Sequence, residues 1–258
     1  MTNAALAELS DNTVAVAILL YAVAMLAFAG EQAARASART TTRREAALAA
    51  RRAAAERTRV MVGAGGPPPA APPAPAEGVV SRVRSRAGRI GMAFTVAGIA
   101  VHLVSVVARG LSVDRVPWGN MYEFSSAVTL SASVIFVVLV ARGTVDRGIG
   151  AFVMLPVVLS LGLAATVLYT PAGPLVPALD SYWIRIHVFA AVLCTGAFLL
   201  SGVVAGLYLL RAAYDARGGS SRFPLSMGAT LPSARSLDRA SYAVIAFAFP
   251  LWTFAIIA

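Results

Sequence analysis

The chain has 258 residues, of which 58% are hydrophobic and only 13% are charged. A soluble domain carries about 25% charged residues, so this composition excludes an ordinary soluble protein. The mean hydropathy of +0.74 instead indicates a polytopic membrane protein. The formal net charge is +10, but no folded basic domain accompanies it, so we expect no nucleic-acid partner. Membrane insertion and contact with anionic membrane lipids explain the charge more simply.

Six apolar runs are long enough to cross the hydrocarbon core as helices, which requires roughly 20 residues each. They predict spans near 13–30, 90–109, 122–141, 149–169, 187–210 and 240–258. Helices are required because lipid offers the backbone no hydrogen-bond partner, and the runs lack the alternation of barrel strands. The predicted fold class is therefore all-α, a polytopic transmembrane helical bundle of about six spans.

The basic residues, all of them arginine, predict the orientation. With the N-terminus outside, the cytoplasmic segments 31–89, 142–148 and 211–239 hold 12, 2 and 5 arginines, which makes 19 of the 22. The positive-inside rule then places the N-terminus outside in a multi-pass protein of the plasma membrane. The first run is no secretory signal, because Glu8 and Asp11 precede it and arginines follow it, so we expect a retained anchor.

The chain divides into three predicted segments. Residues 1–30 form an N-terminal membrane anchor helix, residues 31–89 a cytoplasmic linker rich in Arg, Ala and Pro, and residues 90–258 a membrane domain. The composition of 31–59 allows the first helix to continue into the cytoplasm. The prolines and glycines from Gly63 to Gly78 instead predict an extended linker, and 217–235 predicts a second irregular connection.

A short loop with several polar and aromatic residues precedes the third span. Residues 115–124 read Arg-Val-Pro-Trp-Gly-Asn-Met-Tyr-Glu-Phe. Asn120 and Glu123 predict a capping box at the start of the helix. Trp118 and Tyr122 are typical of an interfacial aromatic belt. Capping and anchoring alone account for every polar residue of this loop.

A second loop leads into the fifth span, near His187. A neutral imidazole at the outer end of a helix can bind a haem iron, while an aromatic residue such as Trp183 offers a flat apolar wall. Arg185 can pair with a haem propionate. The plainer alternative is that His187 and Trp183, four residues apart on one helix face, anchor the helix among the headgroups. The residues alone favour this alternative.

Two further residues lie inside predicted spans. His102 is an ionisable group within the membrane, where burial is costly. It predicts either a haem relay inward of the outer face or a hydrogen-bonded contact between helices, and the second is the better interpretation. Cys194 is typical of a small packed apolar residue. Glu123 and Asp180 lie in separate loops, so we assign no catalytic residue.

Three motifs, in this order, resemble the CcsA/ResC-type membrane proteins of system II cytochrome c maturation, called CcsB in actinobacteria. They are Pro117 with Asn120, Tyr122 and Glu123; the segment from Pro177 through Trp183 to His187-Val188; and Leu237-Asp238 with Tyr242 and Phe249-Pro250-Leu251. Together they cover residues from about 90 to 258. This combination is more specific than any single motif.

The resemblance implies haem handling. Members of the family, with a ResB-type partner, deliver haem to the outer membrane face. They hold it between two external histidines beside a Trp-rich loop, the WWD domain, and present it for covalent attachment to apocytochrome c. His187 corresponds to the first external ligand, which makes it the expected metal site for a transient b-type haem. The accompanying cofactor-binding candidates are Trp183, Arg185, Trp118, Tyr122 and His102.

The chain departs from the family at its C-terminal end. The WWD loop and the second external histidine would follow residue 258, so we expect an N-terminal portion of a longer protein. With only His102 and His187 present, we expect no stable six-coordinate haem spectrum from this chain alone. Whether it acts as part of a haem-attachment enzyme stays open. The alternatives are a membrane transport or channel subunit and an inactive structural fragment.

Overall fold

Helices make up almost all of the described structure, which is a computed structural model. It describes residues 3–61, 77–175, 181–219 and 222–257, with the side chains of 43, 56–61 and 77–85 left out. The elements are α1 (Asn3–Met61), α2 (Glu77–Ser112), α3 (Met121–Ala141), η1 (Arg147–Ile149), α4 (Gly150–Thr166), α5 (Tyr182–Ala216), η3 (Leu225–Thr230) and α6 (Ala234–Ile257). Within this part of the chain, six helices are long and apolar enough to cross a membrane. The predicted all-α class is confirmed.

Most helices extend beyond the predicted spans, whereas α4 ends at Thr166, three residues before the predicted end of its span. α1 continues without a break to Met61, as the composition allowed, because alanine, arginine and glutamate favour helix outside the membrane as well. α2 begins at Glu77, so the predicted linker is wrong at Gly78, which is helical. The rest of the proline-rich part, 62–76, lies outside the described residues, as does 176–180 with Asp180. The predicted irregular connection contains the short helix η3 and gives way to α6 at Ala234.

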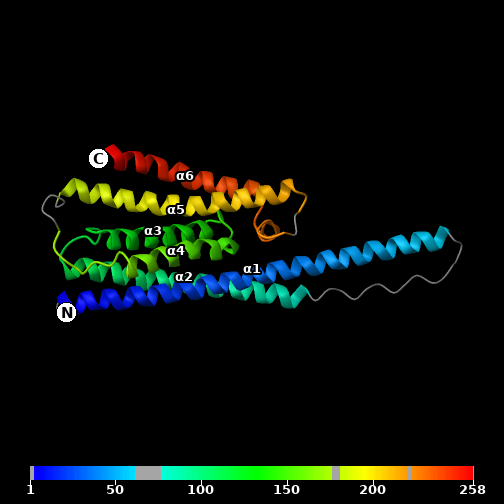
Figure 1. Cartoon of the computed structure of the whole chain (residues 1–258), viewed down its shortest axis with the longest axis horizontal. Helices are drawn as coiled ribbons and strands as arrows, with labels where there is room; N and C mark the ends of the chain where they lie inside the picture. The colour runs from blue at the N-terminus through cyan, green and yellow to red at the C-terminus, as the bar shows by residue number, and fades with distance from the viewer. Residues whose placement is uncertain (1–2, 62–76, 176–180, 220–221, 258) are drawn as a thin grey trace.

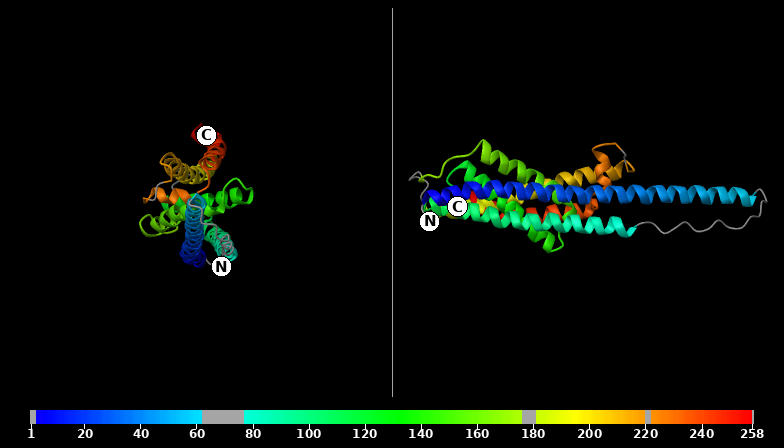
Figure 2. Two further views of the ribbon diagram at one scale, coloured as in Figure 1. Left: turned by 90° about the vertical axis from the view of Figure 1, so that its right-hand side faces the viewer. Right: turned by 90° about the horizontal axis from the view of Figure 1, so that it is seen from below.

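The helices form a bundle in which α1 lies along α2 and α5 lies along α6 (Figure 1). α4 packs on α1 and α3, and α3 joins this group to α5. Both ends of the described chain lie at one end of the bundle, together with the α2–α3 and α4–α5 connections. We call this the outer end, because the arginine distribution predicts that it faces away from the cytoplasm. The α3–α4 connection and η3 lie at the opposite, cytoplasmic end, beyond which α1 projects (Figure 2).

The core lies among α1, α3, α4 and α5. Phe28 and Phe136 are fully buried, with ring centroids 6.2 Å apart in an edge-to-face arrangement. Small residues on α2 allow it to pack closely on α1. A Cβ at Gly91 would lie 2.9 Å from the Phe28 ring, and one at Gly98 would lie 2.8 Å from the Tyr21 ring. Helix association through small residues is typical of membrane bundles.

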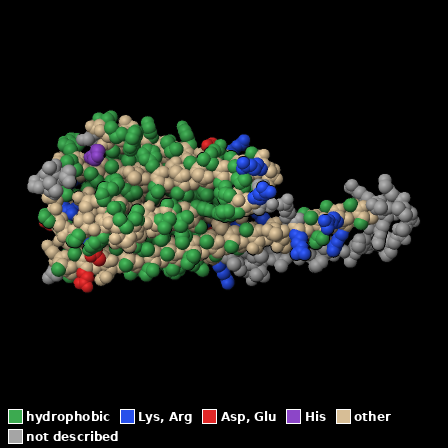
Figure 3. Space-filling model, viewed as in Figure 1, with side chains coloured by type: hydrophobic (Ala, Val, Ile, Leu, Met, Phe, Trp, Pro, Cys, Tyr) green, Lys and Arg blue, Asp and Glu red, His purple; other side chains and the backbone are tan. Residues whose placement is uncertain are grey.

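The surface agrees with a transmembrane bundle. Apolar side chains cover the sides of the helices in Figure 3, while arginines gather near the cytoplasmic end and along the projecting part of α1. Large apolar residues such as Leu159, Phe247 and Ile256 are more than half exposed. In water these faces would be unfavourable, whereas lipid acyl chains cover them without cost.

Candidate functional site at the outer end

A buried carboxylate lies at the centre of the outer end. The side chain of Glu123 is 1% exposed. Its Oε2 accepts hydrogen bonds from Arg115 Nη1 and from the Gly119 amide, both at 2.8 Å. Its Oε1 accepts from Arg115 Nη2 at 3.1 Å and from Arg109 Nε at 3.2 Å. Four donors therefore satisfy both oxygens, which is what a buried carboxylate requires.

The predicted cap of α3 forms only in part. Asn120 Oδ1 accepts from the Glu123 amide at 2.9 Å, which confirms Asn120 as the N-cap. The reciprocal half of the capping box is missing, because the Glu123 carboxylate binds Gly119 and the two arginines instead. Bonds to guanidinium groups are stronger than a bond to one neutral amide, so the carboxylate leaves the position that a capping box needs.

Arg109, at the end of α2, extends this network to α1 and to the segment after α4. Its Nη1 lies 3.5 Å from Asp11 Oδ1, and its Nη2 donates to the Thr170 carbonyl. Its guanidinium carbon lies 5.1 Å from the centroid of Tyr122 and 5.8 Å from that of Tyr169. The Tyr169 hydroxyl donates to Asp11 Oδ2 at 2.7 Å, and this hydrogen bond raises the pKa of Tyr169. The network thus ties together the outer ends of α1 to α4.

Tyr122 and His102 are both buried. Tyr122, expected in an interfacial belt, is 2% exposed because its ring packs against Arg109 and Tyr169. His102 has no exposed surface. Its Nε2 lies 2.9 Å from Ser126 Oγ, and its Nδ1 lies 3.4 Å from the Tyr21 hydroxyl. His102 therefore makes the hydrogen-bonded helix contact that was the preferred interpretation of the sequence.

Trp118 connects the first motif loop to α5. Its ring lies 6.2 Å from that of Phe189, with the planes tilted by 43°. Arg115 fixes the same loop, because its Nε donates to the Gly173 carbonyl at 3.0 Å and its Nη1 donates to the Val116 carbonyl at 3.0 Å. The loop before α3 and the start of α5 thus lie side by side at the outer end.

His187 is half-buried near the start of α5. It precedes Ser201 by about four helical turns and so lies on nearly the same face. Ser201 Oγ is 3.0 Å from Ser241 Oγ of α6. Continuing this antiparallel register along α6 brings His187 level with Ala255, which is 3% exposed. His187 therefore lies on the side of α5 that faces the outer end of α6.

Trp183 and Arg185 accompany this histidine. Trp183 is one turn further out on the same helix face, is 59% exposed, and packs edge-to-face on Tyr182 with ring centroids 6.2 Å apart. Arg185 is also exposed. His187 and Trp183 thus share one helix face, whereas Arg185, two residues from each, points to a different side of α5.

The arginines and their acidic partners were not recognised as a site from sequence. Arg109 and Arg115 are two of the three arginines that fall outside the predicted cytoplasmic segments, and their charge alone assigned them no role. The sequence did contain a signal for this charged network, because an arginine at the end of an apolar span must find a counter-charge or a water-filled space. The sequence does not reveal which carboxylate pairs with Arg109, since Asp11 lies 98 residues away from it.

Fold and site together define a polytopic helical membrane protein with a candidate binding site at its outer end. Residues 118–258, more than half of the chain, match the family model described as Cytochrome C assembly protein. The chain belongs to this cytochrome c assembly family. The match begins in the first motif loop and includes α3 to α6, so α1 and α2 precede it.

Curated relatives support the same family. The chain is 33% identical over 108 residues to the cytochrome c biogenesis protein CcsA of Cycas taitungensis, and 33% identical over 119 residues to that of Gloeobacter violaceus. These matches cover 41% and 43% of this chain, and 33% and 35% of the relatives. A CcsA of Guillardia theta is 26% identical over 185 residues, covering 66% of this chain and 60% of the relative. The chain thus spans about one third to three fifths of their length. No solved structure matches it.

The described residues fit one side of a haem. A haem group needs an iron ligand, an apolar wall and a cationic partner for its propionates. His187 and Trp183 offer the first two from one face of α5, and Arg185 offers the third from a different side of the helix. His102 is bonded through both ring nitrogens, which leaves His187 as the available imidazole. Within the described part of the chain, no three His, Cys, Asp or Glu side chains gather as a metal site. Among the described residues, His187 would therefore hold the iron.

Proposed function

We propose that this chain handles haem in cytochrome c maturation, holding it at the outer face of the plasma membrane for covalent attachment to apocytochrome c. Membership of the cytochrome c assembly family supports the role in cytochrome c biogenesis. The position of His187 carries the haem proposal, because this half-buried imidazole lies at the outer end on the face of α5 toward α6.

In this proposal each residue at the start of α5 has its own task. His187 would hold the iron, Trp183 would offer an apolar wall beside it, and Arg185 would pair with a propionate. When bound, haem supplies the vinyl groups to which cysteine thiols of apocytochrome c add. Trp118 supports α5 through Phe189. Tyr122 and His102 receive no contact with haem, because their rings are buried among other side chains.

The buried network has a positioning task. The Glu123 carboxylate fixes Arg109 and Arg115, and these arginines fix the segment from Thr170 to Gly173 that leads toward α5. Preorganised supports of this kind hold a ligand in place before its cofactor arrives. A ResB-type partner and a second external ligand complete the proposed assembly, a proposal that rests on the family resemblance.

Substituting His187→Ala in the source cells tests the proposal. We expect loss of covalently bound haem in the c-type cytochromes, measured by haem staining of denatured membrane proteins, while immunoblotting shows that the chain is still present. Leu209→Ala is the matched control, because Leu209 is on the same helix, is 65% exposed and lies far from the outer end.

The control variant should retain normal cytochrome c levels. Normal cytochromes in the His187→Ala cells would refute the assignment of His187. If solute uptake changed instead, with cytochromes intact, a transport function would replace it.

A further inference from the structure

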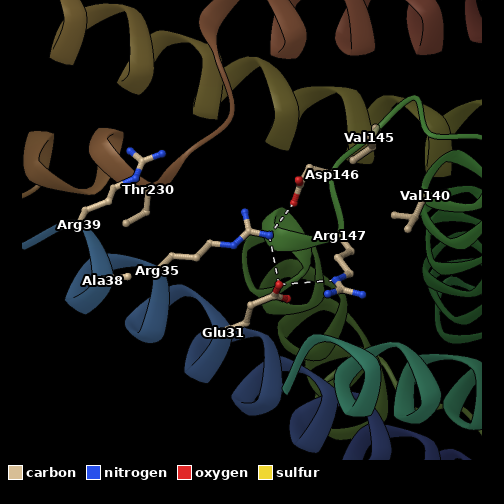
Figure 4. A pocket seen from close by; sticks show the side chains of 9 residues that line it. All are labelled: Glu31, Arg35, Ala38, Arg39, Val140, Val145, Asp146, Arg147 and Thr230. Atoms are coloured by element: carbon tan, nitrogen blue, oxygen red, sulfur yellow. Dashed lines mark hydrogen bonds and ion pairs between the residues drawn. The ribbon is translucent and has the colours of Figure 1, made fainter. Parts of the chain in front are cut away.

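Two cavities meet at the cytoplasmic end of the bundle. One is polar, has a volume of about 540 Å³ and is lined by charged residues of α1 and η1 (Figure 4). The other is an apolar groove of about 640 Å³ along α2. Val140, near the end of α3, and Arg147 of η1 line both cavities. Arg147 thus marks the boundary between a polar and an apolar space.

The polar cavity is a built site with an excess of positive charge. Arg35, Arg39 and Arg147 line it beside the carboxylates of Glu31 and Asp146. Arg35 Nη2 lies 2.9 Å from Asp146 Oδ1 and 3.1 Å from Glu31 Oε1, and Arg147 Nε lies 3.5 Å from the same Glu31 oxygen. Three guanidiniums and two carboxylates leave a local charge of about +1 at neutral pH.

Two polar atoms of this cavity lack a partner. The Glu31 side chain is 1% exposed, and its Oε2 accepts no hydrogen bond; Arg35 Nε is buried and donates none. Buried polar atoms without partners are costly, so an unfilled acceptor and an unfilled donor on two residues that line one cavity indicate a missing group. Hydroxyl groups would satisfy both atoms, because a hydroxyl oxygen accepts from Arg35 and a hydroxyl hydrogen is donated to Glu31.

The apolar groove is long enough to hold part of an acyl chain. Its α2 wall runs from Met92 to Ala100, which is about 12 Å along the helix at 1.5 Å per residue. Small alanines at 93, 97 and 100 leave the space open. Arg89 and Arg147 lie at its cytoplasmic end, the level at which arginines meet lipid headgroups.

We propose that these cavities together bind one anionic phospholipid of the inner leaflet. One acyl chain fills the groove along α2, and the phosphate lies between Arg89 and Arg147. A hydroxylated headgroup, such as glycerol, extends toward Glu31 and Arg35. The site lies at the opposite end of the bundle from His187 and does not depend on the haem proposal.

Native mass spectrometry of the purified 258-residue chain tests this site with phosphatidylglycerol and, as the zwitterionic comparison, phosphatidylcholine. The first variant, Ala97→Phe, fills the groove from an exposed position on α2 without removing a charge. The second, Arg89→Ala, removes one headgroup contact. An arginine near the membrane surface is worth about fivefold in lipid affinity, so Arg89→Ala should bind phosphatidylglycerol about fivefold more weakly. Ala97→Phe should weaken binding at least as much, because its ring occupies the place of the acyl chain.

Two controls lie on the same helix. Val107→Phe places the same aromatic side chain at an exposed position about 15 Å further along α2, and Arg86→Ala removes an exposed arginine that lines neither cavity. Both should retain phosphatidylglycerol. Equal binding of the two lipids by the wild-type chain would overturn the proposal. So would undiminished phosphatidylglycerol binding by Ala97→Phe, or an equal loss in Val107→Phe.

Discussion

At the scale of single residues, one carboxylate holds two guanidiniums and a loop amide at the outer end. Glu123, Arg109 and Arg115 have side chains that are 1%, 3% and 12% exposed. Charges so deeply buried are tolerated only when they are paired, and removing one partner leaves the others uncompensated. These paired charges therefore matter for the positions that they fix, and not for a net gain in stability.

We predict that Glu123→Gln lowers the free energy of unfolding by about 3 kcal/mol, because two largely buried arginines lose their shared counter-charge. Denaturation in detergent measures the effect. Asp215→Asn is the control, since Asp215 forms an exposed pair with Arg211 one turn away on α5 and such pairs contribute about 0.5 kcal/mol. Equal losses in the two variants would contradict the network described above.

A second prediction concerns His102. Ser126→Ala removes the hydroxyl 2.9 Å from His102 Nε2 and leaves a buried polar nitrogen unpaired, which should cost about 1–2 kcal/mol. Ser125→Ala, at the neighbouring and less buried position, should change stability by less than about 0.5 kcal/mol. The two melting temperatures in detergent compare these costs. A more stable Ser126→Ala variant would show that His102 needs no such partner.

At the scale of elements, small residues set the distances between helices. A Cβ at Gly196 of α5 would lie 2.7 Å from Ser131 Oγ and 2.9 Å from the Ala132 amide nitrogen of α3. Backbone atoms cannot move aside as a flexible side chain does, so α5 approaches α3 closely only because residue 196 is glycine. This contact helps to hold the helix that carries His187.

We predict that Gly196→Ala destabilises the bundle, by about 1–3 kcal/mol as in overpacked cores. The matched control is Gly202→Ala on the same helix, where an added Cβ would meet nothing within 4 Å. This control should be neutral or more stable, because alanine favours helix over glycine by about 1 kcal/mol. Thermal unfolding in detergent separates the two, and a neutral Gly196→Ala would contradict the close contact.

The sequence predicted elements better than the contacts between them. Apolar runs located all six long helices, because burying the backbone in lipid leaves helix as the available structure. The N-cap at Asn120 followed from local chemistry. Local chemistry did not predict the partners of Glu123, since two arginines outcompete the amide that a capping box would use. It did not predict the Asp11–Arg109 pair either, because only the tertiary fold brings these two residues together.

The candidate site was predictable to a similar extent. His187 and Trp183 share a helix face through their spacing alone, as the sequence indicated. The relation of His187 to α6 needed the antiparallel register through Ser201 and Ser241. The burial of Tyr122 needed the positions of Arg109 and Tyr169, which come from other segments of the chain.

At the scale of the whole molecule, the two ends of the bundle differ in charge and in chemistry. The outer end holds a compact, paired network and the exposed aromatic residues at the start of α5. The cytoplasmic end holds most arginines and the two cavities that meet at Arg147. This division is what the positive-inside rule expects of an N-out protein.

Cysteine labelling in intact cells tests that orientation. We predict that Pro174→Cys, exposed between α4 and α5, reacts with a membrane-impermeant maleimide added outside. Ala216→Cys, exposed at the last residue of α5, should react only after permeabilisation. The native Cys194 is 1% exposed and serves as the unreactive background. The opposite labelling pattern would invert the proposed topology.

The most direct test of the central claim, that His187 binds haem iron at the outer end, is a ligand exchange read by absorption spectroscopy. The tagged chain would be purified with its associated proteins from cells that make c-type cytochromes, carrying either histidine or cysteine at position 187. A thiolate and an imidazole give iron different electronic environments, so we predict that His187→Cys shifts the Soret band of the co-purified haem, whereas His102→Gln leaves it in place. An unchanged band in His187→Cys, at equal haem content, would show that His187 does not bind the iron.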